Sequence, residues 1–370
     1  MGMAGRATAA GTARYAARFA DRFAPGHFRL SHELTYSSIG AGTYLGDLTG
    51  TVDKSYRAAL AEAVRQGANV LDTAVSYRAQ RSEIALGQAV ADLVTAGEFG
   101  RDELIVTSKG GFITYRINRP DDRVKYLYDT FVKAGVAGPE DLAGGIHCMA
   151  PAYLSQQINW SLRNTGLHTI DIYYLHDPET QLAFVDRTTF RQRVHLAFAR
   201  LEEEVRDGRI GCYGVATWHG LRRAPMAADY VSLEILVNLA RDVAGPDHHL
   251  TAVQFPLSAG MAEAATFRNQ QVGKSLQPCL AAARDLGLTV MTSASMMQAQ
   301  RLDRLPASLA AAFPDLNSNA QRALHFVRSL PGVTTVLAGM SHLEHVRENL
   351  SLATRPPEPE QAARILHTLR

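Results

Sequence analysis

Eight times between about residue 36 and residue 354, an apolar run typical of a buried strand is followed by the spacing of an amphipathic helix. Several of the apolar runs are continuous, as in a parallel sheet covered on both faces. Stop signals such as Gln66-Gly67 and Asp207-Gly208 end the helical patterns. Eight such units predict an α/β fold, a (β/α)8 TIM barrel, and a doubly wound sheet is the alternative. Strands are expected near 36–42, 69–73, 104–109, 170–176, 210–216, 250–255, 288–293 and 333–338, and helices near 53–66, 82–95, 151–165, 190–207, 221–241, 274–286, 318–330 and 343–353.

The pattern predicts one domain over 31–370, preceded by an extension over 1–30. The extension is rich in Ala and Arg, and is expected to be a short packing helix or a disordered segment. Two connections are longer than ordinary loops, at 110–150 after the third strand and at 294–317 after the seventh. The first is rich in aromatic residues, so we expect it to form a lid-like insertion beside the active end of the barrel.

Composition excludes several classes of partner. The chain carries 38 basic and 36 acidic residues, a net charge of +2, which offers no electrostatic footprint for nucleic acid or for a membrane surface. Cys148, Cys212 and Cys279 are too few and too far apart for a disulfide framework or a zinc pair. These features favour a cytoplasmic enzyme that acts on a small molecule.

Four polar residues stand at or just after the ends of predicted strands. Asp72 and Tyr77 follow the second strand, Lys109 ends the third, and His176 ends the fourth. A charge at the end of an apolar strand costs stability unless it is paired. Three consecutive strands that deliver Asp, Lys and His, with a nearby Tyr, therefore predict one shared site that can donate a proton to a carbonyl oxygen.

These residues belong to a longer set of ordered motifs that resembles the aldo-keto reductase family, over nearly all of residues 36–354. The resemblance implies a (β/α)8 barrel, a nicotinamide dinucleotide cofactor, and interconversion of carbonyl compounds and alcohols. The motifs are Gly42-Thr43-Tyr44, Asp72-Thr73-Ala74 with Tyr77, Lys109, Asp171 with His176, Gln254, and Gly339-Met340-Ser341 with Glu348-Asn349.

By this resemblance Tyr77 is the general acid-base. The pKa of tyrosine is ordinarily about 10, and a nearby ammonium lowers it by stabilising the phenolate. Lys109 is the candidate ammonium, Asp72 can keep it charged and aimed, and His176 can hydrogen-bond the carbonyl oxygen. Each residue alone has a plain structural interpretation, such as a helix cap for Asp72; their joint order favours catalysis.

The resemblance also implies the cofactor contacts. Gln254 and Thr217 are expected at the nicotinamide carboxamide, although Ala216-Thr217 stands where the family has Ser-Asn, and Ser293 stands where it often has an aromatic residue. His345 is the candidate partner of a 2′-phosphate, so NADP (as NADPH) is favoured and NAD remains possible. The full expected set is Gly42, Thr43, Tyr44, Asp72, Thr217, Gln254, Ser293, Gly339, Ser341, His345, Glu348 and Asn349, with Arg347 offset in register.

The substrate pocket is expected to be apolar, because Tyr44, Phe112, Trp218 and Met296 lie just past strand ends. Two other functions remain open. A metal-dependent barrel hydrolase could use His147, His176, Asp177 and His219, but ligand spacings on one element are missing, so no metal is expected. A regulatory or redox-sensing subunit could bind cofactor with little turnover.

Overall fold

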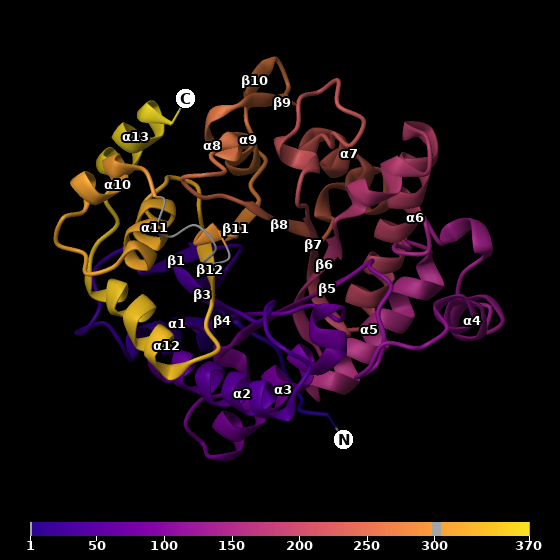
Figure 1. Cartoon of the computed structure of the whole chain (residues 1–370), viewed down its shortest axis with the longest axis horizontal. Coiled ribbons are helices and arrows are strands. Elements are labelled where there is room, and N and C mark those ends of the chain that lie inside the picture. The colour runs from indigo at the N-terminus through magenta and orange to yellow at the C-terminus, as the bar shows by residue number, and fades with distance from the viewer. Residues whose placement is uncertain (1, 298–304, 370) are drawn as a thin grey trace.

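Eight parallel strands close into a barrel in the computed structural model, which describes residues 2–297 and 305–369. The order around the barrel is β11-β12-β3-β4-β5-β6-β7-β8. Figure 1 shows the strands at the centre with the helices arranged around them. The strands are β3 (Ile39–Gly42), β4 (Val70–Asp72), β5 (Ile105–Gly110), β6 (Ile170–His176), β7 (Ile210–Ala216), β8 (Leu250–Pro256), β11 (Thr289–Ser293) and β12 (Thr335–Gly339).

One helix follows each barrel strand and buries an apolar face against the sheet. Several of these helices begin at a capping residue. Thr49, for example, accepts a hydrogen bond from Val52 N at the start of α2. The (β/α)8 prediction is therefore confirmed. The helices are α2 (Gly50–Arg65), α3 (Arg81–Thr95), α5 (Pro151–Thr165), α6 (Arg187–Arg206), α7 (Leu233–Ala244), α9 (Cys279–Asp285), α11 (Asn319–Arg328) and α12 (Leu343–Leu350).

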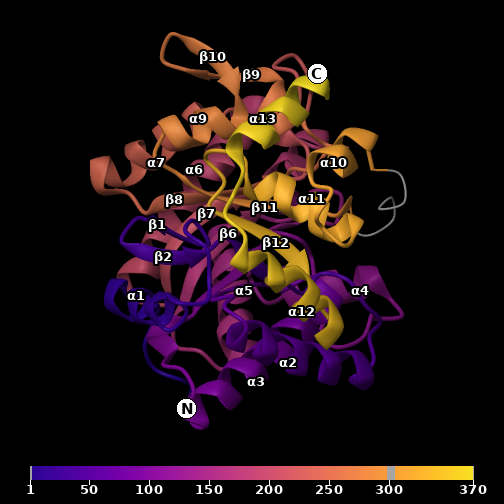
Figure 2. The same ribbon diagram turned by 90° about the vertical axis from the view of Figure 1, so that its left-hand side faces the viewer.

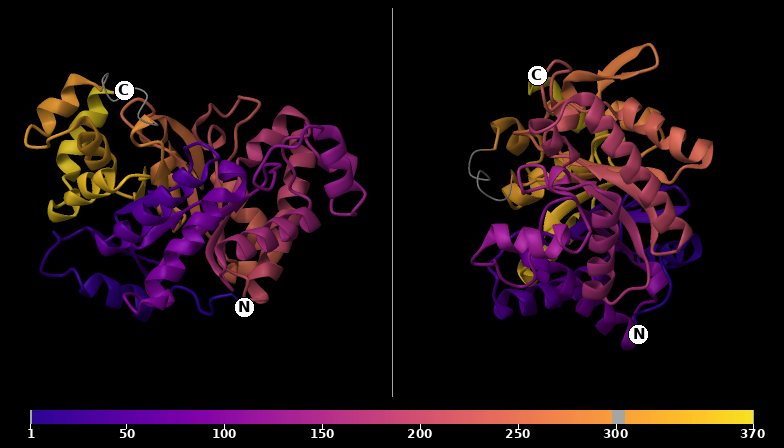
Figure 3. Two further views of the ribbon diagram at one scale, coloured as in Figure 1. Left: turned by 60° about the horizontal axis from the view of Figure 1, so that its bottom comes forward. Right: turned by 90° about the vertical axis from the view of Figure 1, so that its right-hand side faces the viewer.

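Two expected helices begin later than the sequence indicated. The helix expected over 221–241 starts at Leu233, because Pro225 interrupts the preceding stretch and Ser232 caps the first turn. Residues 274–278 belong to a hairpin of β9 (Arg268–Val272) and β10 (Ser275–Pro278), and α9 begins only after Pro278. This hairpin projects from the rim of the molecule in Figures 2 and 3.

Residues 2–30 pack against the amino-terminal ends of the barrel strands. The helix α1 (Ala9–Ala17) buries Tyr15, whose hydroxyl donates to Val64 O at 2.6 Å. Ala7 N donates to Asp171 Oδ1 at 2.6 Å, and Asp171 Oδ2 pairs with Arg101 at 2.7 Å. The strands β1 (Phe28–Ser31) and β2 (Leu34–Ser37) form a hairpin beside α1, on the left side of Figure 2.

The stretch between β5 and α5 folds into short elements on the outer side of α5. It contains α4 (Arg123–Leu127), which Figure 1 shows farther from the barrel centre than α5. Phe131 is fully buried there and packs on Tyr153 and Trp160 of α5. Further short helices are α8 (Glu263–Thr266), α10 (Ala307–Ala312) and α13 (Pro359–Thr368). No helix in the described part of the chain has the length and apolarity needed to cross a bilayer.

Candidate active site

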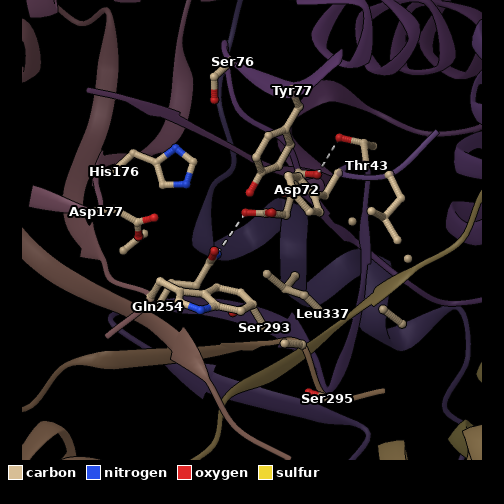
Figure 4. A pocket seen from close by; sticks show the side chains of 18 of the residues that line it. Thr43, Asp72, Ser76, Tyr77, His176, Asp177, Gln254, Ser293, Ser295 and Leu337 are labelled. Atoms are coloured by element: carbon tan, nitrogen blue, oxygen red, sulfur yellow. Dashed lines mark hydrogen bonds between the residues drawn. The ribbon is translucent and has the colours of Figure 1, made fainter. Parts of the chain in front are cut away.

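A cavity of about 530 Å³ opens at the carboxyl ends of the barrel strands, the end that hosts active sites in this architecture. Figure 4 shows Tyr77, His176 and Asp177 around it, with Asp72 at its base. The lining residues are Gly42, Thr43, Tyr44, Leu45, Asp72, Ser76, Tyr77, Arg78, Phe112, His176, Asp177, Ala216, Thr217, Trp218, Gln254, Ser293, Ala294, Ser295, Met296, Leu337, Ala338 and Gly339.

An ion pair lies buried beneath this cavity. Lys109 Nζ is 2.7 Å from Asp72 Oδ2 and donates to Thr73 O at 2.8 Å. The other oxygen of Asp72 accepts hydrogen bonds from Thr107 Oγ1 at 2.7 Å and from Gln254 Nε2 at 3.0 Å. Burial lowers the pKa of Lys109, and the charge of Asp72 opposes that shift. The two buried charges thus neutralise each other, and both oxygens of Asp72 accept hydrogen bonds.

The Tyr77 ring lies over this pair and reaches into the cavity (Figure 4). Lys109 Nζ is 4.8 Å from the centre of the ring. Burial and the charge of Asp72 raise the pKa of Tyr77 well above its usual value. The net shift is thus opposite to the lowering expected from Lys109, because burial and the charge of Asp72 outweigh any stabilisation of the phenolate by the ammonium. The phenol remains a protonated donor.

His176 ends β6, the strand next to the one that carries Lys109. Its ring centre is 5.8 Å from that of Tyr77 and 5.0 Å from that of Phe112. Burial, followed by the charge of Lys109, lowers the pKa of His176 well below its usual value. The imidazole is therefore neutral at physiological pH, and a neutral imidazole can donate one hydrogen bond without repelling Lys109.

A second buried histidine supports His176 from behind. His147 Nε2 is 2.7 Å from His176 O, and its Nδ1 accepts from Gln181 Nε2 at 2.9 Å. Both ring nitrogens are thus engaged, and burial lowers the pKa of His147 to about 4. The residues considered for a metal hydrolase therefore do not converge. Across residues 2–297 and 305–369, no group of three His, Cys, Asp or Glu could hold a metal ion.

Three consecutive residues after Tyr77 adopt left-handed backbone conformations without being glycine. The φ angles of Arg78, Ala79 and Gln80 are 49°, 52° and 73°. Such a run has a high conformational free energy, and it persists because contacts with neighbouring residues stabilise it. Arg78 Nη2 donates to Asp53 Oδ1 at 2.7 Å. Ile117 N donates to Ala79 O at 2.9 Å, which ties the turn to the segment after β5.

Replacing Ala79 with glycine should raise the free energy of unfolding by about 0.5–1 kcal/mol. Relief of a left-handed alanine is worth roughly 1–2 kcal/mol, and the added freedom of the unfolded chain offsets roughly half. Denaturant unfolding measures the change. Ala58→Gly, at an exposed interior position of α2, is the matched control and should lower stability instead. Destabilisation by Ala79→Gly would contradict the assignment of strain.

The structure divides the expected cofactor residues into two groups. Those on strand ends line the cavity, including Thr217, whose Oγ1 is buried with no hydrogen-bond partner among the described residues. Those on α12 or just before it lie outside the cavity. Ser341 O accepts a hydrogen bond from Ser55 Oγ at 2.5 Å, and Glu348 accepts one from Ser318. Asn349 is buried, and His345 is exposed near His342, which precedes the helix. The cavity-lining members are Gly42, Thr43, Tyr44, Asp72, Thr217, Gln254, Ser293 and Gly339.

All four expected substrate residues, Tyr44, Phe112, Trp218 and Met296, line the cavity. The wall that carries Trp218 is anchored by a buried carboxylate that the sequence analysis did not identify. Glu179 Oε1 accepts hydrogen bonds from the backbone N–H groups of Trp218, His219 and Gly220, at 2.8, 2.8 and 3.1 Å.

Two charged lining residues were also missed as contributors to the cavity, namely Arg78 and Asp177. Asp177 was considered only as a metal ligand. Its place directly after the strand-ending His176 was a usable signal, because residues at a carboxyl strand end surround the site of a barrel. Arg78 gave no comparable signal, since it lies on the left-handed run.

Comparisons with known proteins agree with this geometry. A sequence model of the aldo/keto reductase family matches residues 38–369. A Bacillus subtilis (strain 168) protein named uncharacterized oxidoreductase YqkF is 23% identical over 342 residues, which cover 91% of this chain and 94% of that protein.

Solved structures share the fold. An aldo/keto reductase from Klebsiella pneumoniae, in complex with NADP and acetate, superposes with a TM-score of 0.62 at 19% identity, over 94% of this chain and 96% of that one. A glycerol dehydrogenase from Gluconobacter oxydans superposes with a TM-score of 0.63 at 16% identity, over 94% and 95%.

Proposed function

The chain belongs to the aldo/keto reductase family, and we propose that it reduces an aldehyde or ketone to an alcohol with NADPH, or catalyses the reverse reaction. The observation that carries the proposal is the neutral Tyr77 phenol beside a neutral His176, above the buried pair of Asp72 and Lys109. This constellation can serve a carbonyl oxygen that gains negative charge.

Each residue has a distinct part in the proposed reaction. A reduced nicotinamide, when bound, supplies the hydride for the carbonyl carbon. His176 donates a hydrogen bond to the carbonyl oxygen and fixes its position. Tyr77 transfers its phenolic proton to that oxygen as negative charge develops, and the nearby Lys109 ammonium stabilises the resulting phenolate. Asp72 keeps Lys109 charged and in place.

The strand-end residues fit a nicotinamide cofactor. Thr217 Oγ1 is buried without a partner among the described residues, beside Gln254 on the neighbouring strand, and such an orphan hydroxyl is suited to a carboxamide. A side chain at Gly339 would meet nothing within 4 Å, so the end of β12 is open to a ligand. The amino terminus of α12 follows this strand and favours a phosphate.

Turnover with matched cofactors tests the proposal. Purified protein is mixed with a panel of aromatic and aliphatic aldehydes and ketones, with NADPH or NADH, and nicotinamide absorbance is followed. We expect oxidation of NADPH that depends on the carbonyl compound. Cofactor binding by calorimetry without any turnover would favour the regulatory alternative. A stoichiometric bound metal in elemental analysis, with no binding of nicotinamide cofactor, would favour a hydrolase.

The preference for NADPH over NADH is proposed to depend on His345. An imidazole at the start of α12 is a weaker phosphate partner than a guanidinium, so the preference should be modest. His345→Gln is expected to lower the ratio of NADPH affinity to NADH affinity about two- to fivefold. This corresponds to part of the binding free energy of one charge-assisted hydrogen bond. Calorimetric titration with both cofactors measures the ratio, and Arg347→Gln is the matched control.

We also propose that the start of the segment over 110–150, at Phe112, forms part of the wall of the substrate pocket, while the rest of the segment packs against α5. Phe112 lines the cavity and packs edge-on against His176, which supports this role. Phe112→Leu is therefore expected to raise KM for an aromatic aldehyde about tenfold, since an aromatic contact is worth roughly 0.5–1.5 kcal/mol beyond its buried area. Cofactor affinity should change less than twofold. An equal weakening of aldehyde binding and of cofactor binding would contradict the place of Phe112 in the substrate pocket.

A further inference from the structure

Three charged side chains line the cavity, and two of them have their charge balanced. Asp72 is paired with Lys109 at 2.7 Å, and Arg78 is paired with Asp53 at 2.7 Å. Asp177 forms no ion pair with any residue that the structure describes. The pocket therefore contains one carboxyl group whose charge is unmatched, and a ligand with the opposite charge would match it.

The surroundings of Asp177 explain why the protein itself does not supply a counter-ion. The loop after β7 directs three backbone N–H groups toward Glu179, and the one from Trp218 also lowers the pKa of Asp177, but none of them carries a positive charge. The Lys109 ammonium is close enough to influence Asp177, but it donates to Asp72 and to Thr73 O. Figure 4 shows the Asp177 carboxyl group beside the His176 ring, on the same side of the cavity.

The remaining walls suit a cation as well. Tyr44, Phe112 and Trp218 bring three aromatic rings to the cavity, and aromatic faces attract ammonium groups, more strongly where water is excluded. An isolated carboxylate also repels an anionic substrate. Aromatic walls with one unmatched carboxyl group together favour a positively charged ligand over a neutral or negative one.

We propose that the pocket selects a carbonyl compound that carries an ammonium group, and that Asp177 recognises this group. The inference rests on the proposed function for its reaction, but not for the binding of the cation. Burial and the charge of Glu179 raise the pKa of the Asp177 carboxyl, so a bound cation would recover charge stabilisation that the empty pocket withholds.

A pair of isosteric alcohols tests the binding directly. Choline and 3,3-dimethylbutan-1-ol differ only in a quaternary nitrogen in place of carbon, and each resembles the alcohol product of a reduction. Calorimetry on the full chain with NADP is repeated at several pH values, because the pKa of Asp177 is raised, and is expected to give at least about tenfold tighter binding of choline at the upper end of the range. Equal affinities, tighter binding of the neutral alcohol, or no binding of either would overturn the proposal.

The variant Asp177→Asn tests whether Asp177 causes the preference for choline. Asn keeps the shape of the side chain and tolerates the left-handed backbone at this position, where φ is 43°. The choline preference is expected to fall about tenfold in this variant. Asp47→Asn removes the same charge from an exposed loop at the same end of the barrel and is the control. A preference that persists in Asp177→Asn, or that falls equally in Asp47→Asn, would overturn the role of Asp177.

Turnover separates this inference from the proposed function. Betaine aldehyde and 3,3-dimethylbutanal are the corresponding substrates, and kcat/KM with NADPH is compared as a ratio. A ratio above about ten in the native chain, reduced in Asp177→Asn, supports both proposals. Reduction of both aldehydes at equal rates would overturn the proposed selection of a cation and leave the proposed function standing. Choline binding without reduction of either aldehyde would overturn the proposed function alone.

Discussion

Tyr77→Phe is expected to lower kcat by about 10²–10⁴-fold while cofactor affinity changes less than twofold. The phenyl ring keeps the contacts with Tyr44 and with Lys109, and only the proton donor is lost. Because the pKa of Tyr77 lies well above its usual value, the native residue enters the reaction protonated, and no other phenol in the described chain occupies its place beside His176.

Single-turnover reduction with saturating NADPH measures this effect without a contribution from product release. Tyr44→Phe is the matched control, since it removes a hydroxyl from the same cavity, and its kcat should fall less than about tenfold. Near-native turnover in Tyr77→Phe would remove this residue from the role of general acid. An equal loss of kcat in Tyr77→Phe and Tyr44→Phe would indicate that the reaction needs a polar pocket and not a proton from Tyr77 in particular.

Lys109→Met is expected to abolish measurable turnover and to lower the free energy of unfolding by about 3–5 kcal/mol. Lys109 is fully buried and Asp72 is 4% exposed, so removal of the ammonium leaves a carboxylate without its counter-ion. Thr107 and Gln254 still donate to Asp72, which limits the loss of stability, but neither carries a positive charge.

The double variant Lys109→Met with Asp72→Asn separates stability from catalysis. With both charges gone, most of the lost stability should return, because a neutral amide is far less costly to bury than an unpaired carboxylate. Turnover should remain absent, because no ammonium lies near Tyr77. Urea unfolding and single-turnover kinetics measure the two quantities. Activity that returns together with stability would show that Lys109 has only a structural role.

The barrel was predictable because each of its strands appears in the sequence as a short apolar run that can be identified without knowledge of distant residues. The strands expected at 170–176 and 210–216 match β6 and β7 to the residue. Continuous apolar runs between helical patterns leave few other folds. The helix boundary at Leu233 was missed since the apolar spacing continues through the residues around Pro225, and only the capping position of Ser232 decides where the turns begin.

The site was predictable where chemistry coincides with a strand end, and was missed where it depends on turns. Asp72, Lys109 and His176 stand at such ends, which places them together in any parallel barrel. Glu179 was missed because its significance comes from three backbone N–H groups some forty residues away along the chain. The left-handed conformation of Ala79 has no signature in the sequence, since alanine ordinarily favours helices.

The contacts of the amino-terminal segment also set an order of events during synthesis. Ala7 is hydrogen-bonded to Asp171, 164 residues further along, and Tyr15 to Val64. The stretch before α1, which reaches Asp171 through Ala7, therefore cannot complete its contacts until β6 has been made. A nascent chain stalled before β6 would hold α1 against its earlier partners but leave the Ala7 N–H without its acceptor, so this end of the barrel closes late in synthesis.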